Sequence, residues 1–359
     1  MMINKSKLTL IIDGNWLLIS RMSNMIGKFA TEKDMMLETK LLMIKSINKV
    51  LRLFPKIDNI IFVADGGSWR ASEKIPDCLN TDTKNELIPC ATYKGTRMQD
   101  KNLDWEVIFG EYEKFLETLD YNGIQVCKEP GIEGDDWCWY WSTKLNDDNT
   151  NVIIWSKDKD LTQLVNKNSD GVFTVCWNDG GVTCKQTVDE DDLTSFLLNP
   201  YYAINEQLLH DIIQHSSAKI GIDPKAILVE KIFRGDKGDN IFPIIQRKSK
   251  SGSNKLFRIS TKDMDFSLNV YDDNAVKNYI DNLLEQKNYK NRVLHSIEDI
   301  YEHFYFNRKL VSLNEKEYPQ YVKDIFSKYK TYKFSKNIVE TEQQIQAEKN
   351  AINELLDSI

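Results

Sequence analysis

The stretch from residue 130 to residue 160 holds acidic side chains whose number and spacing suit metal chemistry. They form two groups, which are Glu133, Asp135 and Asp136, and then Asp158 and Asp160. The first group stands where an aromatic-rich helix is expected to begin near Trp137, and the second follows an apolar run of strand character. Carboxylates gathered in one crevice repel one another, and a fold tolerates them mainly when a cation lies among them. Taken singly, each group has an ordinary interpretation as a helix cap or a solvated loop.

Short strands are the elements that would position these groups. Four apolar runs predict strands over 8–12, 59–64, 123–127 and 152–155. The first two end in Asp13 and Asp65, and the last two precede the two acidic groups. Parallel strands carry their carboxyl ends to one edge of a sheet, where ligands bind. The pattern therefore predicts an α/β fold with these carboxylates at one edge.

Helical spacing of apolar residues accounts for much of the remaining chain. It predicts helices over 34–53, 105–119, 189–198, 208–213, 224–233, 276–286, 297–306 and 315–328, with another in the charged tail from 337. Strands over 172–177 and 182–185, separated by Asn-Asp-Gly-Gly, predict a hairpin. We expect the tail helix to pack on its own protein, with presentation to a partner as the alternative.

The segment 66–104 interrupts this periodicity with a mixture of basic and aromatic residues. It contains Arg70, Tyr93, Lys94 and Arg97. So long a connection inside a compact domain is usually functional or mobile. Its charges belong either to a solvated loop or to an electropositive arch, in which Lys94 and Arg97 meet phosphate oxygens and Tyr93 stacks on a base.

Composition excludes several classes of protein. The 359 residues carry a formal net charge of −7, which argues against a simple nucleic-acid coat protein. The four histidines lie far from the acidic stretch, so a histidine-based triad is not expected. Six cysteines without Cys-x-x-Cys spacing predict reduced thiols rather than a zinc site. No apolar run approaches the roughly 20 residues of a membrane span, and we expect a soluble cytoplasmic protein.

A second informative motif is the turn Arg-Gly-Asp-Lys-Gly-Asp-Asn-Ile over 234–241. Asp236 and Asp239 lie three apart in this glycine-containing turn. They either form an ordinary turn with a helix cap or complete the acidic cluster from its far side.

Together, these motifs resemble the flap endonuclease / 5′-3′ exonuclease family. Within that family the chain is most similar to the bacteriophage branch, which includes enzymes with ribonuclease H activity. The motifs, in order, are Asp13 after the first strand, Asp65 after the second, Tyr93-Lys94-x-x-Arg97, Glu133-x-Asp135-Asp136, Asp158-x-Asp160 and Gly235-Asp-x-x-Asp-Asn240. The similarity covers roughly residues 8–245.

The resemblance implies a PIN-like (resolvase-like) nuclease core with a central, mostly parallel sheet, followed by a helical DNA-binding C-terminal region. Residues 1–200 would form the metal-dependent nuclease domain, with an arch or bridge region over 66–104. Residues 201–359 would form the helical domain, with a helix-hairpin-helix-like DNA-binding region around 230–260.

The resemblance also implies roles for single residues. One metal site would use Asp13, Asp65, Glu133 and Asp135, with Asp136 as a further candidate, and a second would use Asp158, Asp160, Asp236 and Asp239. Lys94 matches the active-site lysine of the family, and it would act in catalysis together with Asp13, Asp65 and Asp158. The implied DNA contacts are Arg70, Tyr93, Lys94, Arg97, Arg247, Lys248, Lys250 and Lys255.

The implied activity is 5′-3′ exonuclease and flap endonuclease cleavage of DNA during replication, and of RNA primers in RNA·DNA hybrid. Two Mg²⁺ ions would serve as cofactors, and Mn²⁺ would substitute for them. The substrates would be DNA with a 5′ flap, a nick or a 5′ end. A phage single-strand-binding protein and a sliding clamp are candidate partners of an expected monomer, which would act in the host cytoplasm if it is phage-encoded.

Two alternatives and one departure accompany this hypothesis. A phosphatase with an aspartate after its first strand usually needs a second aspartate two residues later, where Asn15 stands. A non-catalytic DNA-junction-binding replication scaffold would not need so many costly carboxylates. The Gly-x-Gly turn of the family's duplex-binding motif is replaced by a basic stretch over 247–258, which predicts a flexible loop that either contacts DNA or is a plain linker.

Overall fold

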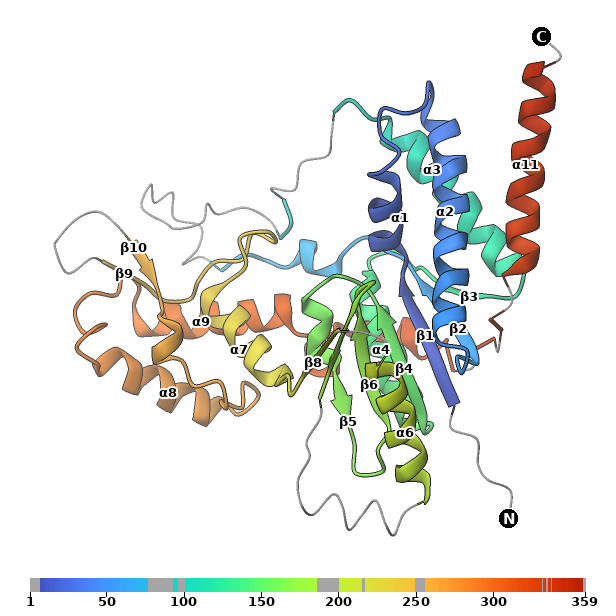
Figure 1. The fold of residues 1–359 in the computed structure, drawn as a ribbon. Coiled ribbons are helices and arrows are strands. Elements are labelled where there is room, and N and C mark those ends of the chain that lie inside the picture. Colours follow the sequence, from blue (N-terminus) through green and yellow to red (C-terminus); the bar gives the residue numbers. More distant parts are fainter. Residues whose placement is uncertain are drawn as a thin grey trace. The chain divides into compact units, whose positions relative to one another are not determined.

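The computed structural model describes residues 7–76, 93–95, 101–185, 200–214, 217–248, 256–330, 332–333, 335–336 and 338–357. The chain divides into two compact units (Figure 1). The first unit comprises Met1–Gly67, Asp100–Ile222 and Asp324–Ile359, and the second comprises Ser68–Gln99 and Asp223–Lys323. The predicted domain boundaries, with a division near residue 200, stay predictions.

A mostly parallel sheet forms the centre of the first unit (Figure 1). Its strands are β1 Lys7–Asp13, β2 Asn59–Val63, β3 Gln125–Cys127, β4 Thr150–Trp155, β5 Asn166–Lys167, β6 Phe173–Trp177, β7 Gly181–Cys184 and β8 Ser217–Ile220. They run in the order β3-β2-β1-β4-β6-β7-β8, and β5 pairs with β6. The pairs β3–β2, β2–β1, β1–β4 and β4–β6 are parallel, whereas β6 and β7 form the predicted antiparallel hairpin. The predicted α/β class with a mostly parallel sheet is confirmed.

Helices cover both faces of this sheet. They are α1 Gly14–Met22, α2 Glu32–Leu53, α3 Trp105–Tyr121, α4 Gly134–Asp147, α6 Pro200–Gln214 and α11 Val339–Asp357. Leu10 and Ile12 of β1 enter one hydrophobic core with side chains of α1, α2 and α3. Ile11 between them is equally buried, as the pleat requires when both faces are covered, and α4 packs against β1, β2 and β4.

The tail helix α11 packs on its own unit. Ile338 and Ile345 are buried in the same core as α2. The Nδ2 of Asn48 donates to Glu342 over 2.8 Å. The Nζ of Lys40 lies 2.9 Å from Glu111 on α3 and 3.5 Å from Glu348 on α11. For the side chains that the structure describes, the expected packing of the tail on its own protein is confirmed.

The second unit is largely helical, and its core lies between α7 Pro224–Arg234, α8 Asp273–Glu285 and α9 Ile297–Val311. Phe233, Ile280 and Phe304 are fully buried there. A two-stranded hairpin, β9 Gln246–Lys248 and β10 Leu256–Arg258, and the short helix η1 Trp69–Ser72 also belong to this unit. The helices predicted over 224–233, 276–286 and 297–306 are thus present.

The structure differs from the sequence predictions at several elements. Helix α1 and strands β5 and β8 were not predicted. The helix expected over 315–328 is wrong, because Pro319 separates η5 Glu315–Glu317 from α10 Gln320–Phe326. The loop expected over 247–258 is wrong at its ends, which pair as β9 and β10. The helix predicted over 189–198 lies outside the described residues.

Four of the six cysteines can be compared with their prediction. Cys127, Cys138, Cys176 and Cys184 are buried free thiols, as expected. Burial raises the pKa of Cys127 and of Cys176 to about 12. Cys78 and Cys90 lie outside the described residues. In the part of the chain that the structure describes, no helix has the length and apolarity needed to cross a membrane.

His303 is expected to make the second unit sensitive to acid. It is buried on α9 beside Phe242, and burial, with the charge of His295, lowers its pKa from 6.5 to about 3. Below pH 6.5 the unfolded chain therefore binds a proton at this histidine that the folded chain does not bind. The free energy of unfolding is therefore highest above pH 6.5, and it decreases by about 1.4 kcal/mol for each pH unit below that value.

Urea unfolding at pH 7 and pH 5 measures this effect, with His303→Gln as the comparison. The wild type should lose about 2 kcal/mol more than the variant over that interval. An equal loss in both proteins would contradict the assignment to His303.

Candidate active site

The candidate site lies at the carboxyl ends of β1, β2 and β4, where the strand order reverses. The chain proceeds outward from β1 to β2 and β3 and then returns to place β4 on the other side of β1. Ile12 pairs with Trp155, and Asp13 pairs with Val63. Such a switch point leaves a crevice outside the strand ends, which is the usual ligand site of an open α/β sheet.

Asp13 ends β1 and caps α1. Its Oδ1 accepts a hydrogen bond from the backbone N–H of Trp16 over 3.0 Å, and its Oδ2 accepts one from the Ser156 hydroxyl over 2.6 Å. Only 8% of Asp13 is exposed. The carboxylate is thus held by the first turn of α1 and by the residue after β4 before any ligand binds.

Asp65 follows β2 and is held by neighbours on both sides. Its Oδ2 accepts from the Asn15 amide over 2.8 Å, and its Oδ1 accepts from the Gly134 backbone N–H over 2.6 Å. The Asp65 N–H donates in turn to Asn15 Oδ1 over 3.2 Å. Asn15 therefore fixes Asp65 relative to Asp13, and Gly134 ties Asp65 to the first turn of α4.

The first acidic group begins α4. Glu133 is its N-cap and Asp136 completes a capping box, with the Asp136 Oδ2 accepting from the Glu133 N–H over 3.2 Å. Both residues are buried, and Asp135 between them is half-buried. The capping interpretation thus describes part of this group, and one oxygen of Asp136 is engaged in it. The predicted metal contacts of all three residues stay predictions.

Ser156 joins the second acidic group to Asp13. Its hydroxyl donates to Asp13 and accepts from the backbone N–H of Asp158 over 3.0 Å. Asp158 is exposed, and its Oδ1 accepts from the Asp160 N–H over 2.8 Å. Asp160 begins η3 Asp160–Leu164. The loop after β4 is therefore oriented by a serine that is itself 3% exposed.

The electrostatics of this edge favour a cation. Burial raises the pKa of Asp13 from 3.8 to about 6, despite hydrogen bonds from Ser156 and Trp16, and the charges of Asp65 and Asp158 add to the increase. Burial, with the charges of Asp13 and Asp65, raises the pKa of Tyr112 well above 10. A divalent cation bound here would offset both costs, because it compensates a buried carboxylate and screens its neighbours.

Gly66→Ala is expected to force apart two loops, which are the loop after β2 that carries Asp65 and the loop before α4 that carries Glu133. Gly66 donates its N–H to Ile132 and accepts from the Gly131 N–H, each over 2.8 Å. A Cβ at Gly66 would lie 1.9 Å from the backbone oxygen of Glu129. Because no side-chain motion can relieve this clash, we expect a loss of about 3 kcal/mol in the free energy of unfolding.

Gly110→Ala is the matched control for that measurement. Gly110 lies inside α3, and no described atom comes within 4 Å of its added Cβ. Alanine there should stabilise the protein by about 0.5–1 kcal/mol through helix propensity. Urea unfolding measures both variants, and a Gly66→Ala protein as stable as the wild type would contradict the close-packing argument.

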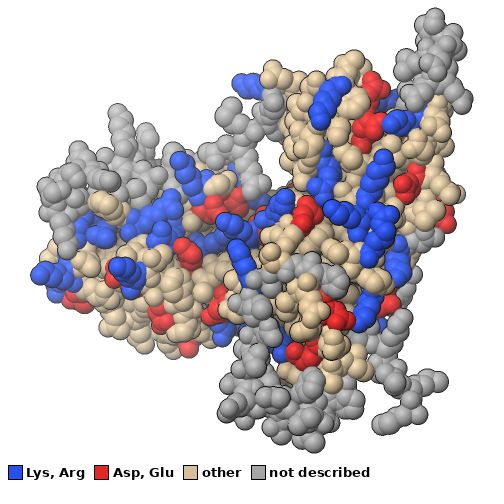
Figure 2. Space-filling model, in the orientation of Figure 1, with Lys and Arg blue, Asp and Glu red and all other residues tan. Residues whose placement is uncertain are grey.

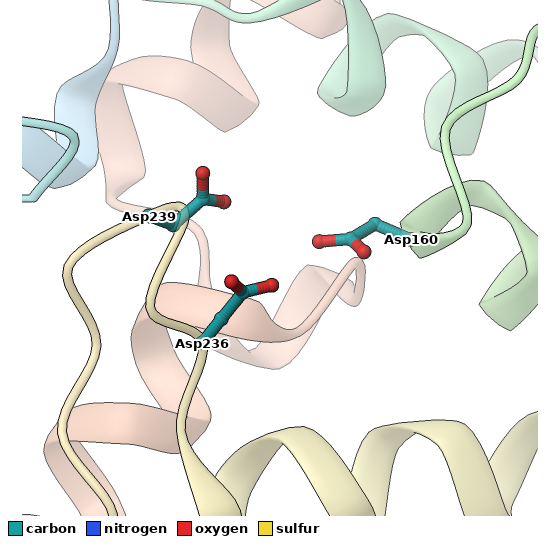
Figure 3. A group of neighbouring side chains, drawn as sticks. All are labelled: Asp160, Asp236 and Asp239. Carbon is teal, nitrogen blue, oxygen red and sulfur yellow. The ribbon is translucent and has the colours of Figure 1, made fainter. Parts of the chain in front are cut away.

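The second unit brings two predicted motifs together. Asp236 and Asp239 extend from the turn after α7, while Asp160 extends from η3 of the first unit (Figure 3). The Asp239 carbonyl accepts the backbone N–H of Lys94 over 2.9 Å. Although burial opposes it, the Lys231 ammonium 2.8 Å away lowers the pKa of Asp236. The predicted site that joins these aspartates to Asp158 and Asp160 stays a prediction.

The remaining predicted DNA contacts in this unit have varied surroundings. Arg70 is 2% exposed, lies 4.5 Å from the Trp69 ring and donates to the Ser312 carbonyl over 3.3 Å. To clamp a phosphate it would have to leave these partners. Tyr93 packs against the core, and the Lys94 ammonium lies 5.0 Å from its ring.

The β9–β10 hairpin carries the other predicted contacts. The Arg247 guanidinium lies 5.6 Å from the ring of Phe257 and 5.3 Å from that of Tyr289, and Lys248 is exposed. Arg97, Lys250 and Lys255 lie outside the described residues. The DNA-binding roles of all these residues stay predictions.

Two positioning residues were missed by the sequence prediction. Asn15 entered it only as the position where a phosphatase would need a second aspartate, and Ser156, directly after the strand predicted over 152–155, was given no role. Their role depends on which strands are neighbours, because Asn15 reaches Asp65 and Ser156 reaches Asp13. The available signal was their place one or two residues from a strand's carboxyl end.

The donor set of the first unit fits a hard divalent cation. It consists of aspartate and glutamate oxygens from the ends of different strands and from the start of α4, with no described histidine or cysteine among them. Oxygen donors of this kind suit Mg²⁺ or Mn²⁺. The raised pKa of Asp13 shows that the same cluster is unfavourable when it is charged and uncompensated.

Comparisons with known proteins agree with this geometry. A family model described as 5′-3′ exonuclease, N-terminal resolvase-like domain, matches residues 8–195. A protein of Mycoplasmopsis pulmonis named 5′-3′ exonuclease is 25% identical over 325 residues, which are 90% of this chain and 86% of that protein. An Aquifex aeolicus protein of the same name is 28% identical over 180 residues, which are 48% of this chain and 60% of that one.

Two solved structures from bacteriophage T5 share the fold. A 5′-exonuclease with bound divalent zinc has a TM-score of 0.50 and 18% identity, and the match covers 90% of this chain and 97% of that one. A flap endonuclease in a complex with DNA and metal ions has a TM-score of 0.50 and 16% identity, with 94% and 99% covered. At these identities the likeness concerns the fold alone.

Proposed function

Because the chain belongs to the 5′-3′ exonuclease family and has its N-terminal resolvase-like domain, we propose that it is a structure-specific 5′ nuclease that hydrolyses DNA with divalent metal ions. The observation that carries this proposal is the convergence of Asp13, Asp65 and the Ser156–Asp158 loop at the switch point of the sheet. The T5 relatives that share the fold were solved with divalent zinc and with DNA and metal ions, which supports the same class of cofactor and substrate.

Carboxylates from both units would hold the cofactor. We assign Asp13, Asp65, Glu133 and Asp135 to one Mg²⁺, and Asp158 and Asp160, with Asp236 and Asp239, to a second. When bound, such ions supply Lewis acidity that neutralises phosphate oxygens and lowers the pKa of water. Asn15 and Ser156 keep Asp65 and Asp13 in place, so the site is pre-organised.

Positive side chains would hold the phosphodiester against this acidic edge. Lys94 would stabilise charge that develops on the scissile phosphate. The face shown in Figure 2 carries groups of Lys and Arg on both units, although the net charge of the chain is −7. Such gathering lets an acidic protein attract a polyanion. Cleavage of RNA primers, a monomeric state, a cytoplasmic location and contacts with a single-strand-binding protein or clamp stay predictions.

One assay tests the proposal directly. A 5′-flap duplex labelled at its 5′ end and internally is incubated with the full chain in Mg²⁺, in Mn²⁺ and in EDTA. We expect short 5′ products only with metal, and their length separates exonuclease from flap cleavage. A matching duplex with a 5′ RNA primer tests the hybrid activity. Binding in Ca²⁺ without cleavage in Mg²⁺ or Mn²⁺ would replace the proposal with the scaffold alternative.

A further inference from the structure

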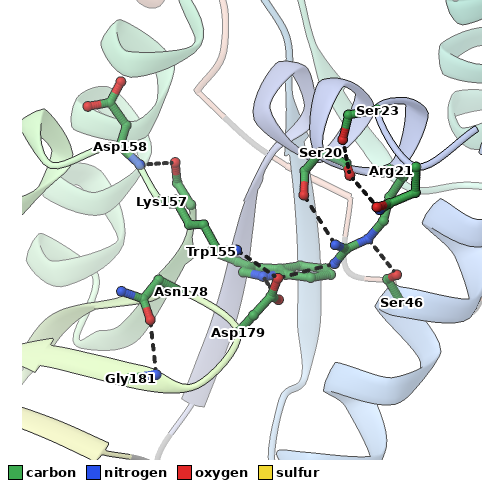
Figure 4. A network of polar contacts seen from close by, with 12 residues as sticks. Ser20, Arg21, Ser23, Ser46, Trp155, Lys157, Asp158, Asn178, Asp179 and Gly181 are labelled. Atoms are coloured by element: carbon green, nitrogen blue, oxygen red, sulfur yellow. Dashed lines mark hydrogen bonds and ion pairs between the residues drawn. The ribbon is translucent and has the colours of Figure 1, made fainter. Parts of the chain in front are cut away.

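Two indoles and two cations surround one carboxylate beside the acidic site of the first unit. This group, called the Trp16 cluster below, consists of Trp16, Arg21, Trp155, Lys157 and Asp179. Figure 4 shows Arg21, Trp155, Lys157 and Asp179 meeting across α1, the end of β4 and the β6–β7 turn. The metal chemistry proposed above uses none of these residues.

The indoles place both cations. The rings of Trp16 and Trp155 lie 5.8 Å apart at 66°. The Arg21 guanidinium is 5.8 Å from the centre of Trp16 and 5.9 Å from that of Trp155. The Lys157 ammonium is 5.7 Å from the centre of Trp16. Cation–π attraction thus draws both positive charges to one indole.

Asp179 is the common anion of the cluster. It lies in the β6–β7 turn with φ of 68° and accepts the Trp155 Nε1–H over 2.9 Å. Its other oxygen lies 3.4 Å from Arg21 and 3.8 Å from Lys157. Two cations against one carboxylate leave a net positive charge.

Arg21 is held in place by further contacts. Its Nε donates to the Ser46 hydroxyl over 2.8 Å, and its Nη1 donates to that of Ser20 over 3.2 Å. The fork is therefore pre-organised, and little side-chain freedom remains to be lost when it binds an anion.

The cluster borders the candidate site through the backbone on both sides. On one side, the backbone N–H of Trp16 donates a hydrogen bond to the Asp13 carboxylate. Lys157 stands between Ser156 and Asp158, and 53% of its side chain is exposed. A net positive surface therefore adjoins the place where a phosphodiester would be cut, and its charge is complementary to that of a polynucleotide.

We propose that the Trp16 cluster is a phosphate-binding site for the DNA strand next to the cleaved bond, with Lys157 and Arg21 as its donors. Asp179 competes with the phosphate for both cations and so limits how tightly the strand is held. The inference rests on the proposed function, because it requires DNA at the neighbouring acidic edge. Neutralising Asp179 should therefore strengthen DNA binding, whereas removing the charge of Lys157 should weaken it.

Binding of a fluorescent 5′-flap duplex in Ca²⁺, measured by anisotropy between 50 and 200 mM salt, tests this pair of effects. Lys157→Ala should weaken binding by about five- to tenfold and reduce the slope of log Kd against log salt by about 0.9, the value for one lost phosphate contact. Asp179→Asn should strengthen binding by about two- to fivefold. Asparagine keeps an acceptor for Trp155 and tolerates the positive φ, so the turn should persist.

Lys56→Ala is the matched control. Lys56 is also an exposed lysine paired with an aspartate, Asp211, over 2.6 Å, but it lies before β2, at the opposite edge of the sheet from Asp13. It should leave the affinity and the salt slope unchanged.

The outcomes separate this inference from the proposed function. Wild-type protein that neither cuts in Mg²⁺ nor binds in Ca²⁺ would overturn both. Protein that cuts and binds, while Lys157→Ala keeps the wild-type affinity and salt slope, would overturn the phosphate site alone. Weaker binding by Asp179→Asn would also overturn it, because the carboxylate would then only support the local fold.

Discussion

Asp13→Asn is expected to reduce flap cleavage at least about a thousandfold and at the same time to stabilise the metal-free protein. Cleavage falls because asparagine is a poorer ligand than a carboxylate for a hard cation, and because Asp13 is held in the site by Trp16 of α1 and by Ser156 after β4. Stability rises because the wild-type carboxylate is buried among like charges, which raises its pKa to about 6.

The pH window of the stability effect follows from the sign of that shift. Between pH 3.8 and about 6 the folded state holds a proton that the unfolded chain has lost, so the stability of the wild type falls as pH rises through this interval. Asparagine does not titrate. The variant should therefore gain nothing near pH 4 and about 3 kcal/mol above pH 7, which corresponds to a rise in Tm of roughly 6–12 °C.

Thermal unfolding in EDTA and in Mg²⁺ measures both parts of the prediction. Magnesium should raise the Tm of the wild type and leave that of Asp13→Asn nearly unchanged, because a ligand stabilises only the state that binds it. Asp211→Asn is the control, since hydrogen bonds and charge from Lys56 lower the pKa of Asp211. It should cut normally and gain no stability at pH 8. An Asp13→Asn protein that cuts within tenfold of the wild type would refute the role assigned to Asp13.

Elements marked by a local sequence pattern were predicted correctly, whereas features that depend on residues distant in the sequence were not. Strand runs that end in Asp13 and Asp65 predicted the parallel sheet, because alternation and turn position are local properties. Helix α1 was missed, since its apolar face is short and its start depends on the Asp13 cap. Pro319 was passed over in favour of helical spacing, although it separates η5 from α10.

The sequence predicted which residue types would form the site, but it did not predict which residues would hold them in place. Which carboxylates would gather follows from strand order once the family is recognised. That Asn15 reaches Asp65, and that Ser156 bridges Asp13 and Asp158, depends on register and side-chain direction. Arg70 illustrates the reverse case. Its sequence context suggested a phosphate contact, whereas a buried carbonyl and an indole ring surround it.

Lys94→Met is expected to lower kcat for cleavage by about 10²–10³ with a much smaller change in KM. The backbone of Lys94 has an uncommon conformation and is held by a hydrogen bond. Its φ of 56° lies in the left-handed region, and its N–H donates to the carbonyl of Asp239. A lysine tolerates this conformation at some cost, and the surrounding contacts must therefore hold the turn. A positive charge that acts mainly in the transition state affects kcat more than KM.

Methionine keeps an unbranched side chain and removes the ammonium group that lies 5.0 Å from the centre of the Tyr93 ring. Lys237→Met is the control, because Lys237 is an exposed lysine on the same turn as Asp236 and Asp239. Single-turnover cleavage of the flap duplex, alongside binding in Ca²⁺, separates chemistry from affinity. If Lys94→Met loses affinity tenfold and cuts bound substrate at the wild-type rate, Lys94 is a DNA contact and not a catalytic residue. A rate loss at unchanged affinity, absent in Lys237→Met, would establish that the turn joining Lys94 to Asp239 serves the chemical step.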